Sequence, residues 1–131
     1  MRAYADTNIF VRHLTGDPPA QAAAASRYLA AANEVLLEDL IVAELAYVLE
    51  SVYKVPRADI AMSLRAVLAF PAIRTADPEL LSRTVEVYDV NGVDFAEAYL
   101  IASAERSGVG VIVSFDRSID RVGTVRREEP V

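Results

Sequence analysis

The sequence predicts an α/β fold, a sandwich in which helices flank a central, mainly parallel sheet. Short apolar runs alternate with longer segments whose apolar residues recur at helical spacing. This alternation is typical of strands joined by crossover helices. Gly, Pro and Asn residues stand between the segments, where helices are expected to begin and end. The helical segments cover more of the chain than the strands do, so a small sheet is expected.

The predicted strands are short and rich in apolar residues. They cover residues 2–6, 34–38, 72–75, 109–115 and 124–127. The run VGVIVSF at 109–115 is the clearest candidate for a buried strand, because it is nearly all apolar and lies between a glycine and a polar stretch.

The predicted helices begin near Pro or Asp or end at Gly or Asn. They cover residues 9–16, 18–33, 40–54, 57–70, 77–90 and 94–108. Asp77 followed by Pro78 is the pattern of an N-cap and a first helical position. Gly16 and Gly108 are natural helix ends, since glycine adopts the left-handed conformation without strain.

Composition narrows the class of protein. The chain has 131 residues, of which 53% are hydrophobic, and it shows no repeat or linker, so one domain over residues 1–131 is expected. The lack of cysteine excludes a disulfide framework and thiolate chemistry, and it suits the reducing cytoplasm. No secretion signal and no membrane span are recognised.

The charged residues give evidence both against and for binding of nucleic acid. The net charge is −6, which argues against nucleic-acid binding through bulk charge. However, Lys54 is the only lysine among the 13 basic residues, and arginine is suited to bidentate contacts with phosphate. Local arginines, among them Arg12 and Arg117, are therefore candidates for phosphate contacts.

Two acids follow predicted strands. Asp6 closes the first strand, and Asp116 comes directly after the run at 109–115. Ligands of open α/β sheets bind outside the carboxyl ends of the strands. If both strands are central and parallel, Asp6 and Asp116 point to the same edge of the sheet.

Two further acids stand among apolar residues of predicted helices. Glu44 has apolar neighbours three and four residues away on both sides, and Glu97 has a similar surround. A lone carboxylate on an apolar stripe is costly unless it is paired or bound to a metal. Asp94 lies one turn before Glu97, so the two acids can share a face, although Asp94 is also a natural N-cap.

The five acids together indicate a metal site. Hard oxygen ligands without cysteine suit Mg²⁺ or Mn²⁺ rather than Zn²⁺. Converging carboxylates repel one another and raise each other's pKa values, a penalty that a divalent ion removes. Such an ion can orient a water molecule and stabilise an in-line attack on phosphorus.

Four stretches occur in the order expected of a known family. They are DTNIFVRHL (6–14), VAELAYVL (42–49), VDFAEAYLIASAERSG (93–108) and VIVSFDRSI (111–119). With these stretches the chain resembles the PIN-domain ribonucleases, and most closely the VapC-type toxins of toxin–antitoxin pairs. The resemblance covers nearly the whole chain. Two departures are a Glu at position 97, where the family usually has Asp, and Ser114, where Thr is common.

The resemblance implies a PIN-like fold and a Mg²⁺- or Mn²⁺-dependent endoribonuclease that acts as a toxin in the cytoplasm. It further implies a VapB-type antitoxin partner, an RNA substrate, and a homodimer or a larger toxin–antitoxin assembly. Carried onto this sequence, the four catalytic acids are Asp6, Glu44, Glu97 and Asp116, and Asp94 is kept beside Glu97 because either can be the third acid. All of these except Glu44 are expected to hold the metal. The residues expected to position substrate are Thr7, Asn8, Arg12, Ser114 and Arg117.

Two other functions fit parts of the pattern. A phosphatase of the haloacid-dehalogenase type also has a nucleophilic Asp after its first strand and a later Asp pair, which Asp116 and Asp120 would supply. It needs a second acid two residues after the nucleophile, where this chain has Asn8, which cannot transfer a proton. The other alternative is a catalytically idle module that holds a structural cation and binds a partner protein.

Overall fold

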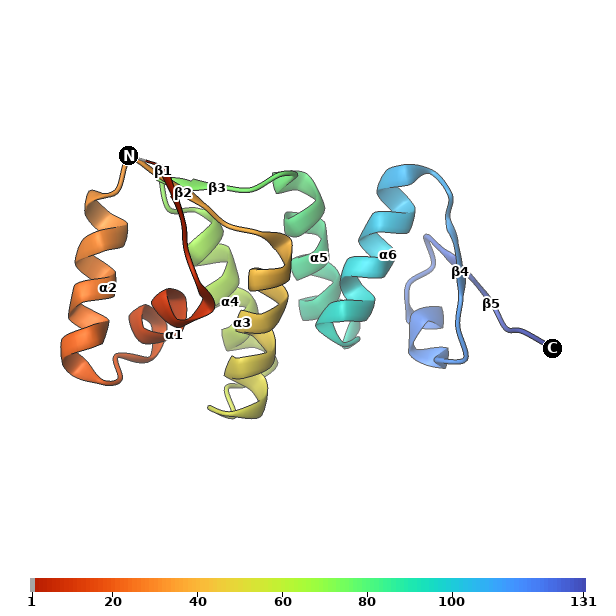
Figure 1. The fold of residues 1–131 in the computed structure, drawn as a ribbon. Helices are drawn as coiled ribbons and strands as arrows, with labels where there is room; N and C mark the ends of the chain where they lie inside the picture. Colours follow the sequence, from red (N-terminus) through yellow and green to blue (C-terminus); the bar gives the residue numbers. More distant parts are fainter. Residues whose placement is uncertain (1) are drawn as a thin grey trace. The chain divides into compact units, whose positions relative to one another are not determined.

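The computed structural model describes residues 2–131 and consists of two compact units, the first ending at Pro78 and the second running from Glu79 to Val131. Each unit contains α-helices and a parallel sheet, so the predicted α/β class is confirmed. The helices of residues 2–131 cover far more of the chain than the strands, as expected from the sequence (Figure 1).

The first unit contains three strands and four helices. In chain order they are β1 (Arg2–Tyr4), α1 (Thr7–Thr15), α2 (Pro19–Ala31), β2 (Glu34–Leu36), α3 (Asp39–Ser51), α4 (Arg57–Leu68) and β3 (Ile73–Arg74). Every one of these elements overlaps a segment predicted from the sequence.

The three strands of the first unit form one sheet in the order β1-β2-β3, with both pairs parallel. Val35 pairs with Ile73 across the second junction, and both side chains are buried. Because neighbouring residues of a strand point to opposite faces, Tyr4, Leu36 and Arg74 share the other face. The buried face is therefore the one that packs against the core of this unit.

The ends of α1 and α3 have different causes. Gly16 ends α1 as predicted, with a φ of 72° and its amide bonded to the Arg12 carbonyl at 2.9 Å. The helix α3 ends at Ser51, three residues before the predicted end at position 54. Lys54 lies in the left-handed region with a φ of 56°, and the Val55 amide bonds back to the Leu49 carbonyl at 3.0 Å, which closes the helix.

A histidine contributes to the packing of the first unit. His13 Nδ1 lies 2.7 Å from the Ser26 hydroxyl, which links α1 to α2. The ring of His13 also meets Phe70 edge to face, with centroids 5.3 Å apart. These contacts give the only histidine of the sequence a structural role.

The second unit contains nearly all of α5 (Pro78–Asn91), then α6 (Phe95–Ser107), β4 (Val111–Val113), the 3₁₀ helix η1 (Arg117–Arg121) and β5 (Arg126–Glu128). The strands β4 and β5 pair in parallel, with Val113 opposite Glu128. The predicted strand at 109–115 is shorter than expected, because Gly110 has a φ of 70° and is not extended and the strand already ends at Val113. The prediction that it is a buried strand was wrong, since of its three residues only Ile112 is buried and Val113 is 65% exposed. The sequence did not predict η1.

Aromatic packing and ion pairs join α5 to α6. Tyr88 is fully buried and meets Phe95 edge to face at a centroid distance of 5.8 Å. Arg83 on α5 donates two hydrogen bonds to the carboxylate of Glu105 on α6, each 2.8 Å long. These contacts hold α6 against α5.

Across residues 2–131, no helix has both the length and the apolar composition needed to cross a lipid bilayer.

Candidate active site

Glu97 lies in the first turn of α6, at the edge of its buried face. Its neighbour Ala98 and Ile101, one turn further on, are both fully buried, while Glu97 itself is half-buried. Its Oε2 atom accepts a hydrogen bond from the Ser118 hydroxyl at 2.7 Å. The structure therefore places this acid at the boundary between core and solvent, with its carboxylate held by a group on η1.

Asp116 is exposed and lies between β4 and η1. It occupies the N-cap position of η1, where its Oδ1 accepts a hydrogen bond from the Ser118 amide at 2.9 Å. Its own amide donates to the Ser114 hydroxyl at 2.9 Å. Ser114, predicted to position substrate, is thus seen to hold the backbone of an acid.

The carboxyl groups of Glu97 and Asp116 interact with each other. The pKa of Glu97 is raised, first by burial and then by a hydrogen bond with Asp116, and the negative charges of Asp116 and Asp94 add to the effect. The pKa of Asp116 is lowered to about 2, mainly by the hydrogen bond with Glu97 and then by the Ser118 amide. The two carboxyl groups thus shift each other's pKa in opposite directions, upward for Glu97 and downward for Asp116.

A divalent cation suits this pair. Two carboxylates within hydrogen-bonding reach repel each other once both are ionised, and a metal ion bound to their oxygens relieves that repulsion in place of the proton. Their oxygens are the donors that Mg²⁺ and Mn²⁺ prefer. Among the described residues, no group of three or more acids or histidines is drawn together tightly enough to hold a metal. Two carboxylates alone do not complete a metal site, so a bound ion would need further ligands.

Asp94 stands at the N-cap of α6, as its sequence context predicted. Within the described chain its side chain makes no capping hydrogen bond, so capping does not occupy its carboxylate. Its charge acts on Glu97 strongly enough to raise the pKa of that residue. The charges of two other acids of the second unit, Asp116 and to a lesser degree Asp94, thus act on Glu97.

The DTN stretch of the first unit follows β1 and opens α1. Asp6 is exposed and caps the helix, because its Oδ1 accepts a hydrogen bond from the Thr7 amide at 2.7 Å. Thr7 is only 3% exposed, and its hydroxyl has no hydrogen-bond partner in residues 2–131. Asn8 is exposed, while the Arg12 side chain bonds Gln21 of α2 at 3.0 Å.

Glu44 lies on the exposed side of α3. Its apolar neighbours divide between two environments: Leu40 and Tyr47 are 76% and 68% exposed, whereas Ile41 and Val48 are half-buried. The apolar surround expected from the sequence is thus present along the helix but is largely open to solvent. Nothing at this position buries the carboxylate of Glu44 in the first unit.

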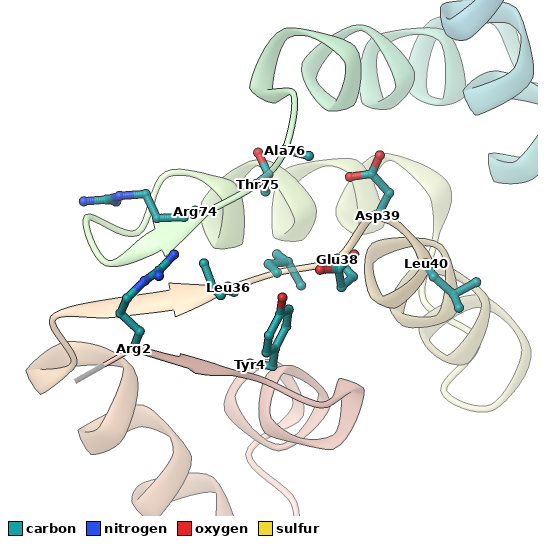
Figure 2. A pocket seen from close by; sticks show the side chains of 10 residues that line it. Arg2, Tyr4, Leu36, Glu38, Asp39, Leu40, Arg74, Thr75 and Ala76 are labelled. Atoms are coloured by element: carbon teal, nitrogen blue, oxygen red, sulfur yellow. The ribbon is translucent and has the colours of Figure 1, made fainter.

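The first unit also has a hollow of about 380 Å³ beside its sheet. Figure 2 shows Tyr4, Leu36 and Arg74 around it, and Glu38 and Thr75 follow the ends of the strands. It lies at the carboxyl ends of parallel strands, where α/β proteins commonly bind ligands. None of the predicted site residues lines it, so it does not mark the acid cluster.

Sequence reasoning missed Ser118, which contacts both Glu97 and Asp116. An Asp followed two residues later by Ser, directly after a strand, is the signal of a side-chain-to-backbone turn that would have placed the Ser118 amide at Asp116. No local pattern links the Ser118 hydroxyl to Glu97, which is 21 residues away along the chain. Arg117, between Asp116 and Ser118, is exposed as a phosphate contact requires.

Comparison with protein families matches residues 3–125 to the model of the PIN domain. No curated protein matches the chain. Among solved structures, the chain is similar to VapBC2 from Rickettsia felis, which was solved bound to a DNA fragment from the promoter of its genes. The identity is 17%, the alignment covers 100% of both chains, and the TM-score is 0.40.

Proposed function

The chain belongs to the PIN-domain family, and on that premise we propose that it is a Mg²⁺- or Mn²⁺-dependent endoribonuclease that serves as the toxin of a toxin–antitoxin pair. PIN domains are generally nucleases. The observation that carries the proposal is that Glu97 and Asp116, two acids of separate family-like motifs, are both hydrogen-bonded by Ser118, at 2.7 Å and 2.9 Å. We treat residues 1–131 as one nuclease domain, because the family match spans both units.

The proposed metal ligands are Asp6, Asp94, Glu97 and Asp116, and Glu44 completes the acidic set or positions the attacking water. A bound divalent ion would supply charge stabilisation at phosphorus and a more acidic water molecule. Carboxylates bind a divalent ion in their ionised form, so metal binding by Glu97 and Asp116 is expected to weaken as the pH falls. Asp94 contributes a carboxylate that capping leaves available.

The remaining side chains orient the reacting groups. Ser114 fixes the Asp116 backbone, and Asn8, which is exposed and follows Asp6 by two residues, is the proposed contact to a phosphate oxygen. The Thr7 hydroxyl serves the same region from a buried position. Arg117 and Arg12 are the proposed contacts to RNA phosphates, and Arg12 must first leave Gln21.

The proposed reaction is hydrolysis of an RNA phosphodiester bond by in-line attack of water. The new bond joins the water oxygen to phosphorus, and the bond to the 3′-oxygen breaks. The products are a 5′-phosphate and a 3′-hydroxyl. Products with 2′,3′-cyclic phosphate ends would contradict this route, because they require the ribose hydroxyl as the nucleophile.

The proposed partner is an antitoxin of the VapB type. With a net charge of −6 and an acidic site, the chain would attract a basic side chain inserted among the acids. The pair α3 and α4 offers a surface for an amphipathic segment of that partner. Assembly as a homodimer, or as a larger toxin–antitoxin complex, and action in the cytoplasm belong to the same proposal.

The test is cleavage of labelled RNA by the purified chain with Mn²⁺, with Mg²⁺ and with chelator. We expect metal-dependent cutting that is lost in Glu97→Gln. Cutting that persists in the variant would indicate a contaminating nuclease. No cutting by the unaltered protein, together with retained binding of a partner protein, would favour the idle binding module instead.

A further inference from the structure

Ser118 donates hydrogen bonds to both Glu97 and Asp116. Its amide donates to Asp116 Oδ1 at 2.9 Å, and its hydroxyl donates to Glu97 Oε2 at 2.7 Å. We propose that Ser118 is a positioning residue that sets the Glu97 carboxylate against Asp116 for metal binding. This inference rests on the proposed function and assigns a role to a residue that the motifs do not single out.

The two hydrogen bonds from Ser118 are separable. The bond to Asp116 comes from the backbone, so it depends on the turn that opens η1 and persists with any side chain that keeps the turn. The bond to Glu97 comes from the side-chain hydroxyl alone. Replacing Ser118 by alanine therefore removes one contact and leaves the other, and the effect on Glu97 can be measured by itself.

The position of η1 is itself fixed, which a positioning role requires. Ile119 and Val122 are buried, with 1% and 3% of their surface exposed. Arg121 donates to the Gly92 carbonyl at 2.9 Å, and the Asn91 side chain donates to the Arg121 carbonyl at 3.3 Å. These contacts attach η1 to the turn between α5 and α6, directly before the helix that carries Glu97.

This arrangement also accounts for a glutamate at position 97. The hydroxyl of Ser118 meets the end of the longer side chain, and an aspartate at this position is shorter by one methylene. Glu97→Asp is thus expected to lose the contact with Ser118. Glutamate has one more rotatable side-chain bond than aspartate. The hydrogen bond from the Ser118 hydroxyl limits the conformations that this bond allows the Glu97 carboxylate.

The experiment is Mn²⁺ titration by calorimetry on the full chain, without RNA. In Ser118→Ala we expect the dissociation constant for Mn²⁺ to rise about tenfold, because groups that orient metal ligands typically contribute this much. Ser118→Thr keeps the hydroxyl and should stay within about twofold of the unaltered protein. The matched control is Ser103→Ala on α6, because the Ser103 hydroxyl donates to the Tyr99 carbonyl of its own helix.

A double-mutant cycle tests whether Ser118 affects Mn²⁺ binding through its contact with Glu97. In the Glu97→Asp background, Ser118→Ala should change the Mn²⁺ dissociation constant by less than about twofold, since the contact is already lost. A tenfold effect in both backgrounds would mean that Ser118 acts through something other than Glu97, and it would overturn the inference.

The outcomes separate this inference from the proposed function. If the unaltered protein binds Mn²⁺ and Ser118→Ala binds it equally well while both have the same urea midpoint, only the positioning role is overturned. If the unaltered protein binds no Mn²⁺, the proposed metal dependence fails, and the role of Ser118 fails with it. Weaker binding in Ser118→Ala, restored in Ser118→Thr, supports both.

Discussion

Asp6 in the first unit and Asp116 in the second have similar local structures but different surroundings. Both follow a parallel strand, both stand at the N-cap of a helix, and both accept a backbone hydrogen bond there. Beyond this, Asp116 interacts with the carboxyl group of Glu97, whereas the Asp6 carboxylate accepts its hydrogen bond from the Thr7 amide. Capping is a sufficient structural reason for Asp6, but it does not explain why a second acid is held beside Asp116.

The different partners of Asp6 and Asp116 distinguish an acid that is explained by helix stability from one that is not. An N-cap stabilises its helix, and Ser, Thr, Asp and Asn serve almost equally well. A second carboxylate beside the first is unfavourable when both are ionised, so its presence calls for a proton or a cation. The second unit thus carries the more direct sign of metal chemistry, and the role of the first unit rests on its family-like motif.

The largest expected effect is loss of RNA cleavage when either acid is neutralised. Asp116→Asn and Asp6→Asn should each reduce kcat/KM by more than about 100-fold, because a metal site contributes several kcal/mol to transition-state stabilisation. Asparagine still caps the helix, so the folded fraction should be unchanged by circular dichroism. A full loss in Asp116→Asn with normal activity in Asp6→Asn would confine the chemistry to the second unit.

Next in size are substitutions in the cores of the two units. Phe10→Ala in the first unit and Tyr88→Ala in the second remove fully buried rings. Each should lower the free energy of unfolding by about 3–5 kcal/mol, as large aromatic-to-alanine changes do. Urea denaturation followed by circular dichroism measures the effect. A cost below about 1 kcal/mol at either position would show that the ring is not part of a packed core.

A smaller effect concerns the ion pair between α5 and α6. The two hydrogen bonds from Arg83 lower the pKa of Glu105, so the pair stabilises the fold above the unfolded pKa of about 4.3 and the stabilisation is lost as the pH falls through the folded pKa. Glu105→Gln should therefore cost about 1 kcal/mol at pH 7 and progressively less below about pH 4.

The control for this pair is Glu79→Gln. Glu79 bonds Arg106 at 2.8 Å, but its side chain is 80% exposed, so the expected cost is below about 0.5 kcal/mol at any pH. Urea midpoints measured from pH 3 to pH 8 give both comparisons. Equal pH profiles for Glu105→Gln and the unaltered protein would contradict the stabilising role of the Arg83 contact.

The smallest expected effect on stability is at Glu44. This side chain is exposed on α3, so Glu44→Gln should change the free energy of unfolding by no more than about 0.5 kcal/mol. The proposed function nevertheless requires a loss of RNA cleavage. Thermal unfolding and cleavage measured on one preparation test both statements, and unchanged cleavage would remove Glu44 from the catalytic set.

Sequence reasoning succeeded where the signal is local. Gly16 and Gly108 end their helices with φ values of 72° and 77°, because a left-handed residue is needed there and glycine supplies it. Periodicity also predicted an apolar surround for Glu97, in which Val93 and Ile101 are buried although Leu100 is 47% exposed. These features depend on a few adjacent residues, so the chain itself carries enough information to predict them.

The remaining features depend on contacts between distant residues. The α3 stripe around Glu44 was recognised, but periodicity identifies a face without telling whether it is covered, and Leu40 and Tyr47 are exposed. The hydroxyl of Ser118 on η1 contacts Glu97 on α6, and β4 lies between these two elements in the chain. No spacing rule describes such a contact. Tertiary packing, rather than local preference, decides both features.

The most direct test of the account is kcat/KM for RNA cleavage in Asp6→Asn, Asp116→Asn and the double variant, all with Mn²⁺. Residues that act as one unit in catalysis are strongly non-additive. If Asp6 and Asp116 serve one metal-dependent reaction, the double variant loses no more activity than either single variant. Losses that multiply in the double variant would show that the two acids act independently, and they would contradict a single metal-dependent reaction served by both.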